Sequence, residues 1–231
     1  VMLHVGTLAA VVLYFRGKIG GLLAGAVSRD ASRRRDAWRV ALLLAVSVGL
    51  TGAITLPLKK LALEGMESLP KIGMALLATS ALLALAQAVG ARRGEGGRTL
   101  EEMRLSDAAL VGACQSLSAV FHGFSRSGNT ISMGLFAGLS RRAAAEYSFL
   151  LSVPTILAAA LVENLSEYRH TGHLVTDGSH AGVYVAGMAT AAVVGYLAVA
   201  SLLKIVVSMK LQPFVAYTAL LGAAVLAVGL S

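Results

Sequence analysis

The 231-residue sequence has few of the residues on which soluble domains depend. Charged residues make up only 14% of the chain and hydrophobic residues 56%, whereas an average soluble domain has about 25% charged residues. The single cysteine, Cys114, has no partner for an intramolecular disulfide, and no long alternation of apolar and polar residues predicts a transmembrane β-barrel. What the sequence does contain is a series of apolar stretches of about 20 residues, the length that a helix needs to cross a bilayer.

These stretches predict an all-α, polytopic integral membrane protein. A further apolar stretch, residues 1–15, reads as a span cut short at its start, because it begins directly at Val1 without the usual polar flank. We therefore expect the sequence to be an N-terminally truncated form of a longer protein with six spans. The five complete predicted spans lie roughly at residues 38–57, 72–91, 146–165, 180–203 and 212–230.

The net charge of +8 does not indicate nucleic-acid binding, because the basic residues alternate between loops. Such an alternation is the positive-inside pattern, which places the basic loops in the cytoplasm. Residues 16–37 and 92–105 are then predicted to be cytoplasmic loops, and the sparsely charged loops, residues 58–71 and 166–180, to lie outside. Fifteen of the 20 Lys and Arg residues belong to the basic group: Arg16, Lys18, Arg29, Arg33, Arg34, Arg35, Arg39, Arg92, Arg93, Arg98, Arg104, Arg141, Arg142, Lys204 and Lys210.

A weak internal repeat relates residues 1–10 to residues 149–158. A loop, a span, a loop and a span follow each copy, so each copy has three spans and the second copy is inverted in the membrane. We therefore predict a single membrane domain over residues 1–231, with a first, truncated repeat over 1–91 and a second over 106–230. The identical pairs are Leu3/Leu151, Val5/Val153, Thr7/Thr155 and Ala10/Ala158.

Residues 106–140 predict a re-entrant helical hairpin. Polar residues interrupt this apolar segment at 125–130, each arm is too short to cross a bilayer, and both flanks are basic. Irregular backbone at membrane depth is tolerated only where it is buried in protein or lines a wet cavity. If the repeat is real, a matching hairpin of about 40 residues would precede Val1.

The interruption contains Arg126, and a cation inside a membrane marks a functional site by default. We expect Ser127 or Asn129 to cap a helix that begins near Thr130, and the free N–H groups of that helix to bind phosphate together with Arg126. Ser125, Ser127 and Thr130 add hydroxyl donors, or a nucleophile if a base is close. The alternative is that the hydroxyls merely hold helices together and that Arg126 pairs with Asp107 or Glu146.

The motif resembles the undecaprenyl-diphosphate phosphatases of the bacitracin-resistance type. Their signature, Pro-Gly-x-Ser-Arg-Ser-Gly-x-Thr, is matched by Gly123, Ser125, Arg126, Ser127, Gly128 and Thr130. The similarity extends over nearly the whole chain, through Gly138–Arg141, Ala144–Leu151, Pro154, Pro213–Tyr217, His4–Ala10 and Tyr14–Arg16.

The resemblance implies a multi-pass protein of the bacterial inner membrane that hydrolyses undecaprenyl diphosphate, a polyprenyl lipid, to the monophosphate and phosphate for cell-wall synthesis. It also implies a divalent cation, Mg²⁺ or Ca²⁺, whose ligands are not in this chain. A homo-oligomer is possible, and the sequence leaves the oligomeric state open. The implied catalytic residues are Arg126, Ser125, Ser127 and Thr130. The implied substrate-binding residues are Gly123, Gly128, Asn129, Gln115 and His122.

The sequence departs from the family pattern in three places. His122 replaces a proline, either as a proton donor or as a substitution that hydrogen-bonds backbone, and Gln115 lies one residue further from the motif than the family's glutamine. The family's Glu-x-x-x-Glu motif is absent, so we expect the chain as given to bind diphosphate but to lack the full catalytic set. Thr171–Leu174, near His170, Asp177 and His180, resembles the end of that motif, but we interpret it as a solvated loop rather than a weak metal site.

Two other functions stay open. Broken helices at an inverted-repeat axis are also transporter architecture, which suggests a flippase for polyprenyl phosphate. A non-catalytic remnant is the other alternative.

Overall fold

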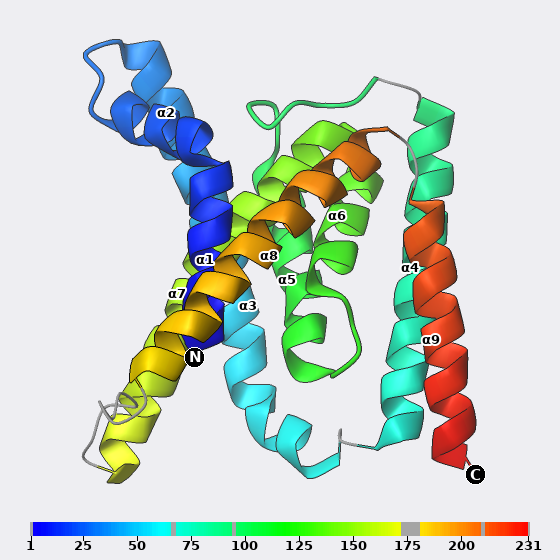
Figure 1. Cartoon of the computed structure of the whole chain (residues 1–231). Coiled ribbons are helices and arrows are strands. Elements are labelled where there is room, and N and C mark those ends of the chain that lie inside the picture. Colours follow the sequence, from blue (N-terminus) through cyan, green and yellow to red (C-terminus); the bar gives the residue numbers. More distant parts are fainter. Residues whose placement is uncertain (1, 66–67, 94–95, 172–180, 209–210, 231) are drawn as a thin grey trace. The chain divides into compact units, whose positions relative to one another are not determined.

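The computed structural model describes residues 2–65, 68–93, 96–171, 181–208 and 211–230 (Figure 1). Within these ranges the chain is almost entirely helical, and its one β-type pairing is an isolated bridge between Arg98 and Leu139. The helices are α1 (Met2–Tyr14), α2 (Arg16–Ala26), α3 (Ala31–Gly65), α4 (Leu69–Arg93), α5 (Leu105–Val120), α6 (Arg126–Phe136), α7 (Arg141–Thr171), α8 (Ala181–Val207) and α9 (Gln212–Leu230).

Five helical segments are long and apolar enough to cross a membrane, and each overlaps one of the five predicted spans over most of its length. A sixth span results if α1 and α2, which are bent by 76° at their junction, are counted as one. Residues 16–26, which the charge pattern assigned to a loop, form α2 instead. The all-α, polytopic fold class is therefore confirmed. The five segments are Ala31–Leu58, Leu69–Arg92, Arg141–Ser166, Gly182–Val206 and Gln212–Leu230.

The helices form two compact units, each assembled from separate stretches of the chain. The first unit contains residues 1–37 and 149–203, and the second contains residues 38–148 and 204–231. In the first unit α1 packs on α8, where the rings of Tyr14 and Tyr196 meet edge to face with their centroids 5.6 Å apart. Each unit takes segments from both predicted repeats, and the repeat itself stays a prediction.

In the second unit α4 and α9 lie side by side, at the right of Figure 1. A Cβ atom on Gly73 would lie 2.9 Å from the carbonyl oxygen of Gly222, and a Cβ atom on Gly222 would lie 3.0 Å from the Cβ of Leu76. Ser80 also donates a hydrogen bond to the carbonyl of Val215 at 2.9 Å. Small residues let two helices in a membrane approach this closely.

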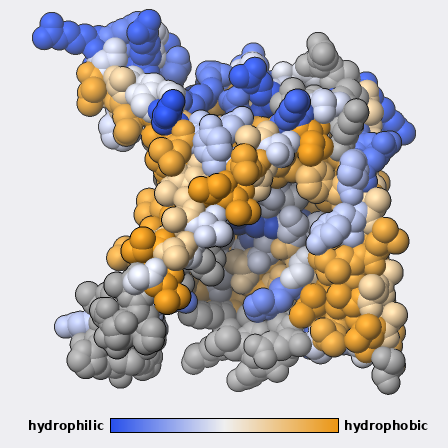
Figure 2. Space-filling view, viewed as in Figure 1, coloured by the Kyte–Doolittle hydropathy of each residue, from blue (hydrophilic) through white to orange (hydrophobic). Residues whose placement is uncertain are grey.

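The side of α9 that faces away from α4 is apolar and exposed, as Figure 2 shows. Tyr217, Leu220 and Val228 are all largely exposed. In water such a surface would be unfavourable, so its exposure agrees with a helix that faces lipid.

Candidate active site

The predicted hairpin is formed by α5 and α6 within the second unit (Figure 1). The helix α5 ends at Val120 and α6 begins at Arg126, so the break lies at residues 121–125. In this turn Gly123 has a φ of +98°, a conformation that residues with a Cβ rarely adopt. A Cβ atom on Gly123 would also lie 2.7 Å from the carbonyl oxygen of Ile72 in α4. The turn therefore requires glycine at this position.

Ser125 is the N-cap of α6. Its extended backbone (φ −73°, ψ 115°) lets its hydroxyl oxygen accept a hydrogen bond from the N–H of Gly128 at 3.1 Å. The prediction that Ser127 or Asn129 caps a helix beginning near Thr130 was wrong, because the helix starts four residues earlier. The side chain of Ser127 thus lies inside the first helical turn, where it does not serve as the cap.

Arg126 is the first residue of α6 and its side chain is exposed. Within the part of the chain that the structure describes, its guanidinium makes no hydrogen bond or ion pair. The two carboxylates considered as partners pair with other arginines: Asp107 with Arg98 at 2.6 Å and Glu146 with Arg142 at 2.8 Å. The alternative in which Arg126 pairs with one of them is therefore wrong, and the cation is available for an anion.

Backbone donors lie at the same helix start as Arg126. The N–H of Asn129 bonds the carbonyl of Ser125 at 2.9 Å, whereas the N–H groups of Arg126 and Ser127 bond no other described residue. Helix N-termini bind phosphate through such unpaired N–H groups and the partial positive charge of the helix. The hydroxyl of Ser127 adds a further donor at the same turn.

His122 lies three residues before the cap, at the hairpin tip, and it is exposed. Among the described residues it has no hydrogen-bond partner, so the backbone hydrogen bond considered for it is not observed. Its role as a proton donor stays a prediction.

Two other predicted site residues, Asn129 and Thr130, are buried and hydrogen-bonded. Asn129 is fully buried and donates from Nδ2 to the hydroxyl of Ser118 at 2.7 Å, whereas its Oδ1 has no partner among the described residues. Thr130 donates to the carbonyl of Arg126 at 2.9 Å and lies 2.6 Å from the hydroxyl of Ser148. These bonds position α6, so the geometry favours a supporting role for both residues over contact with substrate.

Gln115 belongs to a different buried cluster, between α3 and α5. Its Nε2 donates to the hydroxyl of Thr51 at 3.1 Å, and Thr51 in turn donates to the carbonyl of Gly112 at 2.9 Å. Ser47, one turn earlier, donates to the carbonyl of Ala108 at 2.7 Å. Hydrogen bonds of this kind hold membrane helices together, and they place Gln115 in the support of α5.

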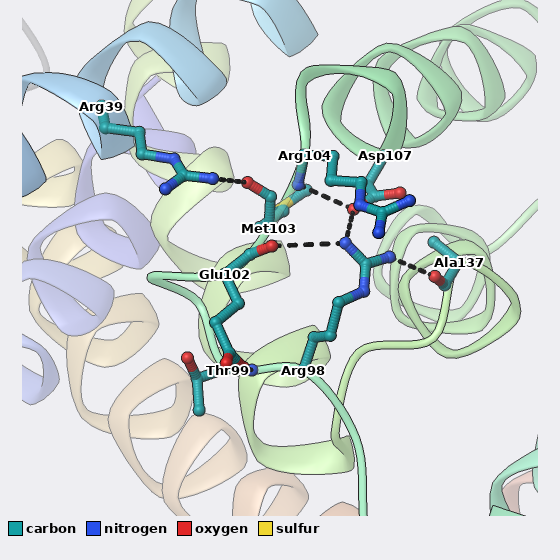
Figure 3. A network of polar contacts seen from close by, with 8 residues as sticks. All are labelled: Arg39, Arg98, Thr99, Glu102, Met103, Arg104, Asp107 and Ala137. Atoms are coloured by element: carbon teal, nitrogen blue, oxygen red, sulfur yellow. Dashed lines mark hydrogen bonds and ion pairs between the residues drawn. The ribbon is translucent and has the colours of Figure 1, made fainter.

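An ionic network holds the base of the hairpin (Figure 3). Arg98 bonds Asp107 at the start of α5 and the carbonyl of Ala137 at the end of α6. Burial alone would raise the pKa of Asp107, but hydrogen bonds from Arg98 and from the N–H of Arg104 outweigh it and lower that pKa below its usual value. The hydrogen bond to Asp107 also raises the pKa of Arg98. One arginine thus joins both arms of the hairpin.

Sequence reasoning missed three residues that contact the motif. Ser118 and Ser148 bond Asn129 and Thr130, and the hydroxyl of Thr79 accepts a hydrogen bond from the N–H of Ser125 at 3.2 Å. Thr79 lies inside an apolar span. A hydroxyl in such a span is the one signal that could have marked it.

The described residues contain no group of three or more His, Cys, Asp and Glu side chains close enough to hold a metal ion. The expected divalent cation and its ligands stay a prediction. The segment Thr171–Leu174, apart from Thr171 itself, and the nearby residues Asp177 and His180 lie outside the described residues.

The chain as a whole matches known proteins. The sequence model of the family described as bacitracin resistance protein BacA matches residues 1–224. The chain belongs to the BacA family. This confirms the resemblance inferred from the arginine motif.

Relatives of this BacA-family chain are named undecaprenyl-diphosphatase. It is 36% identical to the one from Geobacter metallireducens, with 98% of this chain and 81% of the relative covered. It is 38% identical to the one from Geobacter sulfurreducens (97% and 81% covered) and 36% identical to the one from Desulfosudis oleivorans (100% and 84% covered).

Proposed function

We propose that this protein hydrolyses undecaprenyl diphosphate to undecaprenyl phosphate and inorganic phosphate, and so recycles the lipid carrier of cell-wall synthesis. The observation that carries the proposal is Arg126, exposed and without a partner among the described residues, beside the free N–H groups of an α6 N-terminus. The BacA family and the names of its relatives support the same reaction. A bacterial inner-membrane location belongs to the proposal too.

The proposed reaction breaks the anhydride bond between the two phosphorus atoms. Water supplies the oxygen gained by the released phosphate, and the bridging oxygen stays on the lipid monophosphate. Negative charge grows on the bridging oxygen and is spread over the transferred group as this bond breaks. Fixed donors aimed at that charge lower the barrier, because they need no reorganisation during the reaction.

The residues of the hairpin tip take separate roles in this proposal. The guanidinium of Arg126 binds two non-bridging oxygens as a planar fork, and the N–H groups of Arg126 and Ser127 bind others. Ser125 holds the helix start in place, and His122 is the nearest candidate in sequence for giving a proton to the leaving oxygen. The divalent cation stays a proposal with ligands outside the described residues, and no step depends on it.

Arg126 provides the direct test. In a full-length version that includes the expected upstream hairpin, phosphate release from undecaprenyl diphosphate in proteoliposomes should fall by ~100- to 1,000-fold in Arg126→Ala, the range found when one transition-state donor is removed. Arg126→Lys should lose ~10-fold or more, because the ammonium keeps the charge without the fork. Arg92→Ala, which removes an exposed arginine at the end of α4, is the matched control and should match the wild type.

A binding assay tests the binding of phosphate groups by Arg126 separately from turnover. Calorimetric titration of the detergent-solubilised protein with inorganic pyrophosphate should show binding that Arg126→Ala abolishes. Phosphate release that persists in Arg126→Ala, or pyrophosphate binding that does not depend on this residue, contradicts the proposal. Movement of labelled lipid across the membrane without phosphate release would favour a flippase instead.

A further inference from the structure

The tip of the hairpin contacts α4 at successive turns of that helix. A Cβ atom added to Gly123 would approach both Ile72 and Ala75 closely, so Gly123 faces these two residues. Ser125 and Gly128 face Thr79 one turn further along. A Cβ atom on Gly128 would lie 3.5 Å from the methyl carbon of Thr79. One face of α4 therefore lies along the whole turn that precedes the candidate site.

Thr79 contributes a polar atom to this contact. Its hydroxyl oxygen accepts a hydrogen bond from the backbone N–H of Ser125 at 3.2 Å, and its side chain is fully buried. The N–H of an N-cap residue has no acceptor within its own helix, so the Thr79 hydroxyl supplies the acceptor that this part-buried donor has in the structure. Without the Thr79 hydroxyl this part-buried donor would lose its protein acceptor, and the loss of such a hydrogen bond costs about 0.5–1.5 kcal/mol.

The position of Ser125 decides where the site's donors point. Its hydroxyl holds the N–H of Gly128 at 3.1 Å, so the first turn of α6 starts at Arg126 and leaves two N–H groups free. A small change in the cap would rotate or unwind this turn, and a misplacement of about 1 Å in a catalytic group can cost ~100-fold in rate.

We infer that Thr79 is a positioning residue of the phosphate-binding turn: its hydroxyl fixes Ser125, and through Ser125 it sets the direction of Arg126 and of the free N–H groups. The inference rests on the proposed function only for the identity of the ligand. The hydrogen bond and the register of α6 can be tested without turnover.

The test compares substitutions that remove either the hydroxyl group or the methyl group of Thr79. Thr79→Val keeps the shape and removes the acceptor, whereas Thr79→Ser keeps the acceptor and removes the methyl group. Thr79→Ala is a second variant without an acceptor, should valine not fold. Ser80→Ala is the matched control, because the neighbouring hydroxyl bonds Val215 in α9 and not the hairpin.

Hydrogen–deuterium exchange of the detergent-solubilised full chain reports on the turn, and calorimetry with inorganic pyrophosphate reports on binding. In Thr79→Val and Thr79→Ala, exchange of peptides covering residues 123–130 should rise about tenfold and affinity for pyrophosphate should fall about tenfold, the size expected for the loss of one buried hydrogen bond. In Thr79→Ser and Ser80→Ala, both the exchange of these peptides and the affinity for pyrophosphate should stay within about threefold of the wild-type values.

Equal effects of the serine and valine variants would overturn the inference, because packing and not the hydroxyl would then matter. Wild-type exchange and binding in Thr79→Val would overturn it as well. A wild-type protein that neither binds pyrophosphate nor releases phosphate contradicts the proposed function alone, since the exchange data still decide whether Thr79 positions the turn.

Discussion

Gly123 is the position where one added methyl group should damage the site most. Alanine at φ +98° costs ~1–2 kcal/mol in backbone free energy. Its Cβ would lie 2.7 Å from the carbonyl oxygen of Ile72, a backbone atom that can move only with α4, and forced overpacking adds ~1–3 kcal/mol. The free energy of unfolding should therefore fall by about 2–5 kcal/mol in Gly123→Ala.

Thermal unfolding in detergent micelles measures this loss. At about 2–4 °C per kcal/mol for a chain of this size, the midpoint should drop by roughly 4–20 °C, and phosphate release should fall because α6 is displaced. Gly49→Ala in α3 is the matched control: no atom lies within 4 Å of its added Cβ, so alanine should stabilise the helix by ~0.5–1 kcal/mol. A Gly123→Ala protein as stable and active as Gly49→Ala would refute the reasoning.

Two further predictions concern the hairpin base and the topology. Folding lowers the pKa of Asp107, so its ionised carboxylate stabilises the folded protein above the unfolded-state pKa of about 3.9, and this stabilisation is lost as the pH falls through the folded-state pKa. The wild type should therefore unfold at a higher temperature than Asp107→Asn at pH 7. This difference in unfolding midpoint should shrink below about pH 4. In a Cys114→Ala background, an impermeant maleimide applied to intact cells should label a cysteine at Ser179 and not one at Ser28. The opposite labelling pattern would invert the predicted topology.

The sequence predicted the features that depend on composition over many residues. Long apolar runs identified the five spans, because a bilayer requires about 20 apolar residues whatever their packing. The break in the hairpin could be placed to within a few residues, since glycine and an arginine interrupt an apolar segment there. The free guanidinium of Arg126 agrees with the role assigned from the motif, which is still untested.

The features that depend on tertiary contacts could not be predicted. Ser125, Ser127 and Asn129 are all good N-cap residues, and the choice of Ser125 coincides with its bond to Thr79, 46 residues earlier in the chain. Likewise nothing local shows that Thr130 bonds Ser148. The basic residues near the start of 16–26 led to the prediction of a loop, but the apolar residues that follow them in this segment form the helix α2.

The close contact of α4 with α9 limits how the last helix can vary. Gly73 and Gly222 leave no room for a side chain between the two helices, so any larger residue there would push α4 outward. Because α4 carries Thr79, such a change would reach the start of α6 although neither glycine touches the motif. The outward face of α9, with Leu220 and Val228, carries no such restriction. Substitutions in α9 should therefore be tolerated on the side that faces lipid, whereas larger residues should not be tolerated on the side that faces α4.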